Sequence, residues 1–243
     1  MKMIKYLLIL LIVISITSCK IEDKETNKFK VEYSGALKNM MHKGDVSAKV
    51  GLKEFENNAH FYALGAIENL KGEIQIFNSK PFNTMVIDSA LSFDNTFDKK
   101  ATLLVYASIN KWKSFNIPEN IVTYKDLENY IEQTAKENLI TIDEPFPFLL
   151  EGKPKLIDWH VINWKDGDME HSHEKHVKSG LNGTLNNMLV EMLGFYSDSH
   201  HAIFTHHTTN MHIHVKTVDN KLAGHVDGLT LEKGMILKLP YIK

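Results

Sequence analysis

One segment, residues 211–227, constrains the fold of this chain more than any other stretch. It alternates polar and apolar residues, breaks at Asp219-Asn220 and then resumes, which is the pattern of a β-hairpin. His212 and His214 are two residues apart, so a strand directs both side chains to the same face. A two-residue turn at Asp219-Asn220 sets His214 directly opposite His225, with Cβ atoms about 5 Å apart.

Three imidazoles that meet in this way leave a fourth coordination position open, as in catalytic rather than structural zinc sites. The hairpin therefore predicts a metal site at His212, His214 and His225, with Zn²⁺ as the expected ion. Nickel, cobalt or iron would suit similar ligands. The competing interpretation is an ordinary pair of surface histidines, and a turn of odd length would move His225 to the opposite face of the sheet.

The N-terminal segment has the pattern of a bacterial export signal. A short basic start precedes an apolar run over residues 6–16, which is too short for a membrane span. The following Ile16-Thr17-Ser18-Cys19 resembles a lipobox, where the peptide is cut before Cys and the thiol is lipidated. We expect a signal peptide over 1–18, a flexible tether over 19–31 and one domain over 32–243. The protein would be exported and lipid-anchored to a membrane through Cys19, and an uncleaved N-terminal anchor is the alternative.

The charge of the chain limits the classes of molecule that it is expected to bind. The formal net charge is −2, so there is no electrostatic case for binding nucleic acid. Every permanently cationic side chain is a lysine, and the absence of arginine removes bidentate clamps for carboxylates or phosphates. The oligomeric state is left open, with a homodimer as one option.

The hydrophobic pattern favours the α+β class, with mixed, largely antiparallel β-sheets, a few helices and the His-bearing C-terminal hairpin. A helix over 124–138 is predicted by its periodicity and by Thr123 as N-cap. Two further helices are predicted over 31–41 and 184–193, and polar loops over 111–118 and 165–179. The predicted strands cover residues 61–67, 73–77, 82–87, 101–108, 156–164 and 235–239.

Several motifs together resemble the acetolactate decarboxylase family. His-Ile-His at 212–214 and Ala-Gly-His-Val at 223–226 look like its zinc motif, H-x-H followed by G-G-H-V. Residues 65–73 are similar to the family's G-T-F-x-x-L-D-G-E, and Gly194-Phe195-Tyr196 matches a G-F segment before the zinc strand. The matches are colinear and span roughly residues 33–240.

The resemblance implies a carbon–carbon lyase that removes CO₂ from 2-acetolactate, a small oxo acid, and releases acetoin. It implies that His212, His214 and His225 hold the zinc. It also matches the family's acidic residue to Glu73, which would move the proton that completes the product.

The chain departs from the family at three places. The family's arginine near the metal aligns with His160, which could donate a hydrogen bond or carry charge in its place. Ala66 stands where the family usually has threonine, and no residue matches the family's glutamate in a C-terminal tail. These departures predict a different substrate, or weak or lost activity.

Two other functions stay open. The chain could be a non-catalytic metal-binding lipoprotein whose additional histidines, such as His171, His173 and His176, capture zinc or copper. It could also be a related zinc lyase or isomerase that acts on another small oxo acid.

Overall fold

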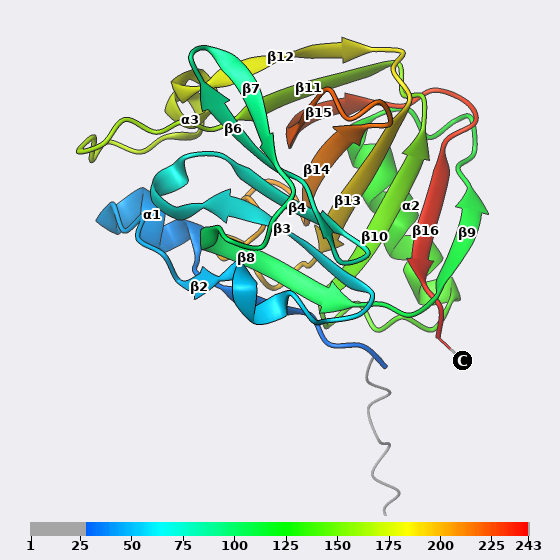
Figure 1. Ribbon diagram of the computed structural model, residues 1–243. Coiled ribbons are helices and arrows are strands. Elements are labelled where there is room, and N and C mark those ends of the chain that lie inside the picture. Colours follow the sequence, from blue (N-terminus) through cyan, green and yellow to red (C-terminus); the bar gives the residue numbers. More distant parts are fainter. Residues whose placement is uncertain (1–27, 243) are drawn as a thin grey trace, which may run out of the picture.

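The computed structural model describes residues 28–242 and contains two antiparallel β-sheets of eight strands each (Figure 1). The first sheet has the order β1-β8-β3-β4-β6-β7, with β2 paired to β8 and β5 paired to β4. Its strands are β1 (Glu32–Ser34), β2 (Val50–Gly51), β3 (Phe61–Ile67), β4 (Glu73–Phe77), β5 (Lys80–Pro81), β6 (Asn83–Ile87), β7 (Ala90–Asp94) and β8 (Lys100–Ser108).

The second sheet contains the histidine hairpin and has the order β12-β11-β15-β14-β13-β10-β16-β9. Its strands are β9 (Trp112–Asn116), β10 (Phe146–Gly152), β11 (Leu156–Val161), β12 (Leu181–Asn186), β13 (Val190–Tyr196), β14 (Met211–Thr217), β15 (Ala223–Thr230) and β16 (Ile236–Pro240). The hairpin strands β14 and β15 therefore lie inside the sheet, between β13 and β11.

Apolar side chains form layers on both sides of the second sheet. One cluster lies between the two sheets and includes Leu64 and Val105 from the first sheet and Leu193 from the second. A separate cluster lies on the other face of the second sheet, where helix α2 (Tyr124–Glu137) packs its Leu127 and Ile131 (Figure 1). The other helices are short: α1 (Leu37–Lys43) and α3 (His173–Ser179), with 3₁₀ turns at Leu52–Phe55 and Glu68–Leu70.

The α+β class, the antiparallel sheets and the C-terminal hairpin are confirmed. Helix α2 is also confirmed, and its predicted cap is present because the Thr123 hydroxyl accepts a hydrogen bond from the backbone N–H of Asp126. The predicted strands all occur, although the strand expected over 156–164 ends at Val161.

The helix predicted over 184–193 is wrong, because this segment forms parts of β12 and β13. Met192 packs into the cluster beneath α2, while the adjacent Leu193 packs into the cluster between the sheets. The helix-like spacing also included Met188 and Leu189, which are exposed between the two strands, so it did not mark a single buried face. The chain turns between the two strands at Asn187, which has a φ of 52°.

Three other predicted boundaries are wrong. The helix over 31–41 is strand β1 followed by α1, separated at Gly35, whose added Cβ would lie 2.1 Å from the Thr102 carbonyl oxygen. The loop over 111–118 contains β9, where Trp112 is half-buried and its indole N–H donates to the Tyr62 hydroxyl over 3.0 Å. The loop over 165–179 ends in helix α3.

The predicted signal peptide, the lipidated Cys19 and the tether as far as residue 27 lie outside the described residues. At the end of the predicted tether, Phe29 and Val31 pack against the apolar cluster between the sheets. Among residues 28–242, no helix has the length and apolar character needed to cross a membrane.

Candidate metal centre

The hairpin brings His214 of β14 directly opposite His225 of β15, in the predicted register. The predicted two-residue turn is wrong. The last pair of the hairpin is Thr217 and Leu222, whose backbone N–H and C=O are 2.9 Å apart, so four residues form the turn. The observed turn of four residues has the same centre as the predicted turn of two. The cross-strand pairs therefore stay the same, and every side chain lies on its predicted face.

The imidazoles of His212, His214 and His225 lie together. Their ring centres are 5.1, 5.1 and 5.6 Å apart, and the Nε2 atoms of His212 and His214 are 3.2 Å apart. Imidazoles that share one tetrahedral zinc have ring centres about 5 Å apart and ligand nitrogens about 3.3 Å apart. His212 and His214 therefore have the spacing of two ligands of one ion, and the His225 ring lies beside them at a ring-centre distance near that of a third.

Neighbouring groups fix the orientation of these rings. The Nδ1 atoms of His214 and His225 each lie 3.2 Å from an oxygen acceptor, Gln75 Oε1 and Asp227 Oδ1 respectively. An acceptor at Nδ1 keeps the proton on that nitrogen and leaves Nε2 free to bind a metal. The Phe204 backbone carbonyl is a weaker acceptor near His212, whose Nδ1 completes no hydrogen bond.

Burial controls the protonation of the two most enclosed imidazoles. It lowers the pKa of His212 and His214 well below the usual range, and the neighbouring histidines lower it further. Both rings are therefore neutral at pH 7, which is the form that binds metal ions.

A second set of ligand atoms lies beside the first. His160, His225 and Asp227 each offer one ligand atom, and these atoms lie within 4.8 Å of one another, so this group can hold a metal ion. His160 is on β11, where it pairs with His225 across the strands, and its Nδ1 is 2.8 Å from Asp227 Oδ2.

The contact between His160 and Asp227 has the character of an ion pair. Burial alone would lower the pKa of His160, but the hydrogen bond with Asp227 and the charge of Glu73 raise it. Burial alone would raise the pKa of Asp227, but hydrogen bonds with His160 and His225 lower it strongly. The position that aligns with the family's arginine thus holds a buried imidazole whose pKa is shifted towards the charged form.

The Glu73 side chain comes from β4 of the first sheet and lies beside the imidazoles of His160 and His214. Its Oε1 accepts a hydrogen bond of 3.1 Å from the backbone N–H of Ile162, and its Oε2 lies 3.7 Å from His214 Nε2. Its Oε1 is 3.8 Å from His160 Nε2. Burial raises the pKa of Glu73, and the charges of His160 and His225 oppose this shift.

All five residues predicted as site residues, namely Glu73, His160, His212, His214 and His225, are therefore close together. Two further residues were not predicted: Gln75, which orients His214, and Asp227, which contacts both His160 and His225. Each lies two positions after a predicted site residue on the same strand, so the alternation of side chains could have indicated both.

The polar segment before α3 holds a separate histidine pair. His171 Nδ1 lies 2.9 Å from His176 Nε2, and the His171 ring stacks on Trp164 with ring centres 4.4 Å apart. Burial, followed by the charge of His171, lowers the pKa of His176 to about 4. These two rings are therefore partly enclosed, and both contact the Trp164 ring.

This pair should make the protein sensitive to acid. The pKa of His176 is lower in the folded than in the unfolded protein, so the unfolded state takes up its proton first as the pH falls. The stability that neutral His176 contributes is complete above the unfolded pKa of 6.5 and is lost as the pH falls towards 4. Urea unfolding at pH 7 and at about pH 4.5 should show a smaller loss for His176→Gln than for the natural chain. Equal losses would contradict this, and the exposed His42→Gln is the control.

Comparison with known proteins adds information about the fold. No protein-family model matches this chain, and no curated protein matches it. The α-acetolactate decarboxylase from Bacillus subtilis strain 168 is structurally similar, with a TM-score of 0.69 and 13% sequence identity, over 88% of this chain and 86% of that chain. The acetolactate decarboxylase from Bacillus subtilis subspecies spizizenii has the same TM-score and identity, over 88% and 87%.

A third similar structure is a protein of unknown function from Staphylococcus aureus, described as similar to α-acetolactate decarboxylase. It has a TM-score of 0.65 and 12% identity, over 88% of this chain and 86% of that chain. Identities this low establish a shared fold and leave the activity to be argued from the site.

Proposed function

We propose that this chain is a zinc-dependent carbon–carbon lyase that converts 2-acetolactate, or a similar 2-hydroxy-3-oxo acid, to acetoin and CO₂. One observation carries the proposal. The buried carboxyl of Glu73, whose pKa is raised by burial, lies 3.7 Å from the Nε2 of His214, which is neutral like the adjacent His212. This arrangement places a carboxyl that can donate a proton next to imidazoles that can bind a metal, in a fold shared with acetolactate decarboxylases.

In this proposal His212, His214 and His225 hold the zinc. The metal would supply Lewis acidity, which draws electron density towards the hydroxyl and carbonyl oxygens of the substrate. Asp227 and Gln75 support this role because they accept hydrogen bonds from Nδ1 atoms and so keep two ligand rings in place.

The residues around the imidazoles would handle charge and protons. Decarboxylation breaks the bond between C1 and C2, and its electron pair moves towards the C3 carbonyl oxygen as CO₂ leaves. A proton must then be delivered to C2. Glu73 can donate it, because one oxygen is held by the Ile162 N–H and burial favours the protonated carboxyl. Solvent protons restore the carboxyl after each turnover.

His160 would position the substrate. Its ion pair with Asp227 gives it positive charge, and its Nε2 lies 3.8 Å from Glu73. This charge can attract the substrate carboxylate in place of the arginine that the chain lacks. A single imidazole cannot grip a carboxylate with two parallel hydrogen bonds, so we expect weaker substrate binding than a guanidinium would give.

We also propose that the domain over 32–243 is exported and lipid-anchored through Cys19. The support is the short apolar run followed by Ile16-Thr17-Ser18-Cys19.

The decisive experiment combines metal analysis of the purified protein with a decarboxylation assay on 2-acetolactate. We expect one tightly bound zinc per chain, with CO₂ and acetoin formed in equal amounts. A zinc-loaded protein that releases no CO₂ from 2-acetolactate or its longer homologues would refute the lyase and leave the metal-binding lipoprotein as the better explanation.

A further inference from the structure

Three histidines outside the buried centre form a line that leads to it. The ring centres of His206 and His207 are 4.0 Å apart, and those of His206 and His173 are 5.5 Å apart. The His173 ring is 6.4 Å from the His160 ring. These side chains come from the loop before β14 and from the first residue of α3, which are far apart in the sequence. The fold therefore brings them together beside the centre.

The inner part of this line is less exposed than its outer part, where His207 and His173 are exposed and His206 is half-buried. The His173 side chain is 54% exposed, Asp227 is 15% exposed and His160 is 7% exposed. His173 Nε2 lies 3.8 Å from Asp227 Oδ1, and the same oxygen lies 3.2 Å from His225 Nδ1. The Asp227 carboxylate thus lies between the His225 ring of the centre and the His173 ring, which is exposed to solvent.

The three outer rings have no evident packing role. His206 makes one local contact, 2.9 Å from its Nδ1 to the Thr208 hydroxyl, which leaves its Nε2 available. Other histidines are used structurally: His200 stacks on Phe204 and hydrogen-bonds Ser197. The ring-centre distances of the outer histidines, 4.0 and 5.5 Å, are near the value of about 5 Å for imidazoles on one zinc. Their ligand atoms do not yet converge within 4.8 Å among the described residues, so the exposed rings must turn to bind one ion, which makes the site weak.

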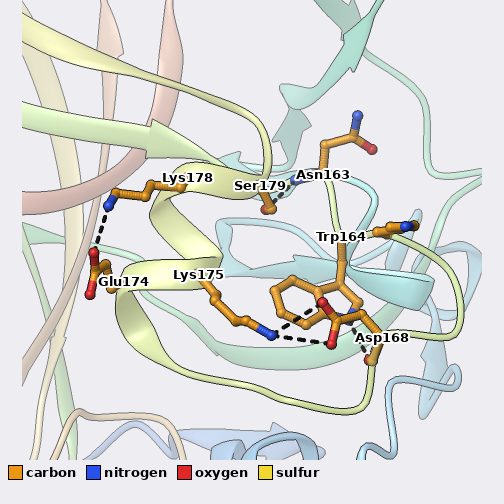
Figure 2. A pocket seen from close by; sticks show the side chains of 8 residues that line it. Asn163, Trp164, Asp168, Glu174, Lys175, Lys178 and Ser179 are labelled. Carbon is orange, nitrogen blue, oxygen red and sulfur yellow. Dashed lines mark hydrogen bonds and ion pairs between the residues drawn. The ribbon is translucent and has the colours of Figure 1, made fainter.

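Charged residues on the neighbouring face of α3 do not compete for this role. Figure 2 shows a pocket on that face in which Lys175 pairs with Asp168 and Lys178 pairs with Glu174. Carboxylates paired with lysine are poor sites for a second cation, because the ammonium group already neutralises them. The histidine line is therefore the better candidate for binding a cation near α3.

We propose that His173, His206 and His207 form a second divalent-cation site, which captures zinc from solution and speeds its transfer past Asp227 to the buried centre. This transfer rests on the proposed function, in which the inner imidazoles hold zinc. An outer site would help an exported protein to take up zinc. Ions in solution reach an exposed site quickly, even though it binds them weakly, and they reach a buried site slowly. The decrease in exposure from His173 to Asp227 and His160 gives the ion a path along side chains that can each bind it.

The test uses the full chain stripped of metal by a chelator. Calorimetric titration with Zn²⁺ should show one tight and one weak site, and Co²⁺ absorption should follow loading of the buried centre over time. The variant His173→Gln/His206→Gln/His207→Gln should lose the weak site and load about tenfold more slowly, because capture raises the local metal concentration. The affinity of its tight site should be unchanged. The double variant His42→Gln/His60→Asn is the matched control, since both histidines are exposed and lie off the line.

Two outcomes separate this inference from the proposed function. If the triple variant binds as many ions as the natural chain, or loads as fast, the outer site is refuted while the buried centre stands. A second variant, His212→Gln/His214→Gln, should lose the tight site and retain the weak one. Weak binding in the natural chain without any tight site would refute the buried zinc and leave the outer site supported.

Discussion

Replacement of His214 by glutamine should remove the tightly bound zinc and lower the turnover of 2-acetolactate by more than about 100-fold. Changes to groups that merely support a metal ligand cost about 10- to 100-fold, and loss of a ligand should cost more. His214 is completely buried and its Nε2 lies 3.2 Å from that of His212, so no solvent-exposed group can replace it. Metal analysis and the CO₂ assay measure the two effects.

The same variant should also lose its stabilisation by metal. Zinc at 100 times its dissociation constant stabilises a folded protein by about 2.7 kcal/mol, and a chain that cannot bind it gains nothing. Thermal unfolding with zinc and with chelator should therefore differ strongly for the natural chain and for His42→Gln, and much less for His214→Gln, which keeps only the weak outer site. A His214→Gln protein with a full complement of zinc and normal turnover would exclude the three-histidine site.

Replacement of Glu73 by glutamine should leave the zinc in place and lower kcat by about 10²- to 10⁴-fold, the usual contribution of a positioned acid or base. Glutamine has nearly the same shape, and its amide oxygen can still accept the hydrogen bond from the Ile162 N–H. What it lacks is an ionisable carboxyl, whose pKa burial raises in Glu73. Steady-state kinetics beside metal analysis will separate loss of proton transfer from loss of metal.

The matched control is Glu68→Gln, in the turn that precedes β4. It changes the same side chain outside the centre and should leave both the metal content and kcat unchanged. If Glu73→Gln turns over as fast as the control, Glu73 is not the proton donor. If it loses its zinc, the carboxyl contributes to the metal site instead.

The hairpin geometry could be predicted from sequence because its two rules are arithmetic. Side chains on a strand alternate with a period of two. Turns of two or four residues with the same centre give the same cross-strand pairs. His214 therefore faces His225 although the turn contains four residues rather than two. The position of Glu73 and His160 beside the imidazoles followed from the family resemblance, since neither residue has a distinctive local pattern.

The other features depend on contacts between segments distant in sequence. Met192 and Leu193 look helical until the apolar clusters on both faces of their sheet are known. The roles of Gln75 and Asp227 depend on which imidazole each one meets across the fold. The line of outer histidines depends on the packing of α3 near the loop before β14, which no periodicity specifies. Tertiary packing, rather than local propensity, decides all three.

The centre lies where two independently hydrogen-bonded sheets meet, and each sheet supplies a different part of it. All the imidazoles belong to the second sheet or its hairpin, while the Glu73 carboxyl projects from the first. Ion binding and proton delivery therefore come largely from different sheets, and the contribution of the first sheet to the metal ligands is Gln75, which orients His214. A lineage that altered the first sheet could abandon catalysis and keep a metal-binding protein, or could acquire a different reaction on the same ion, with no change to the hairpin.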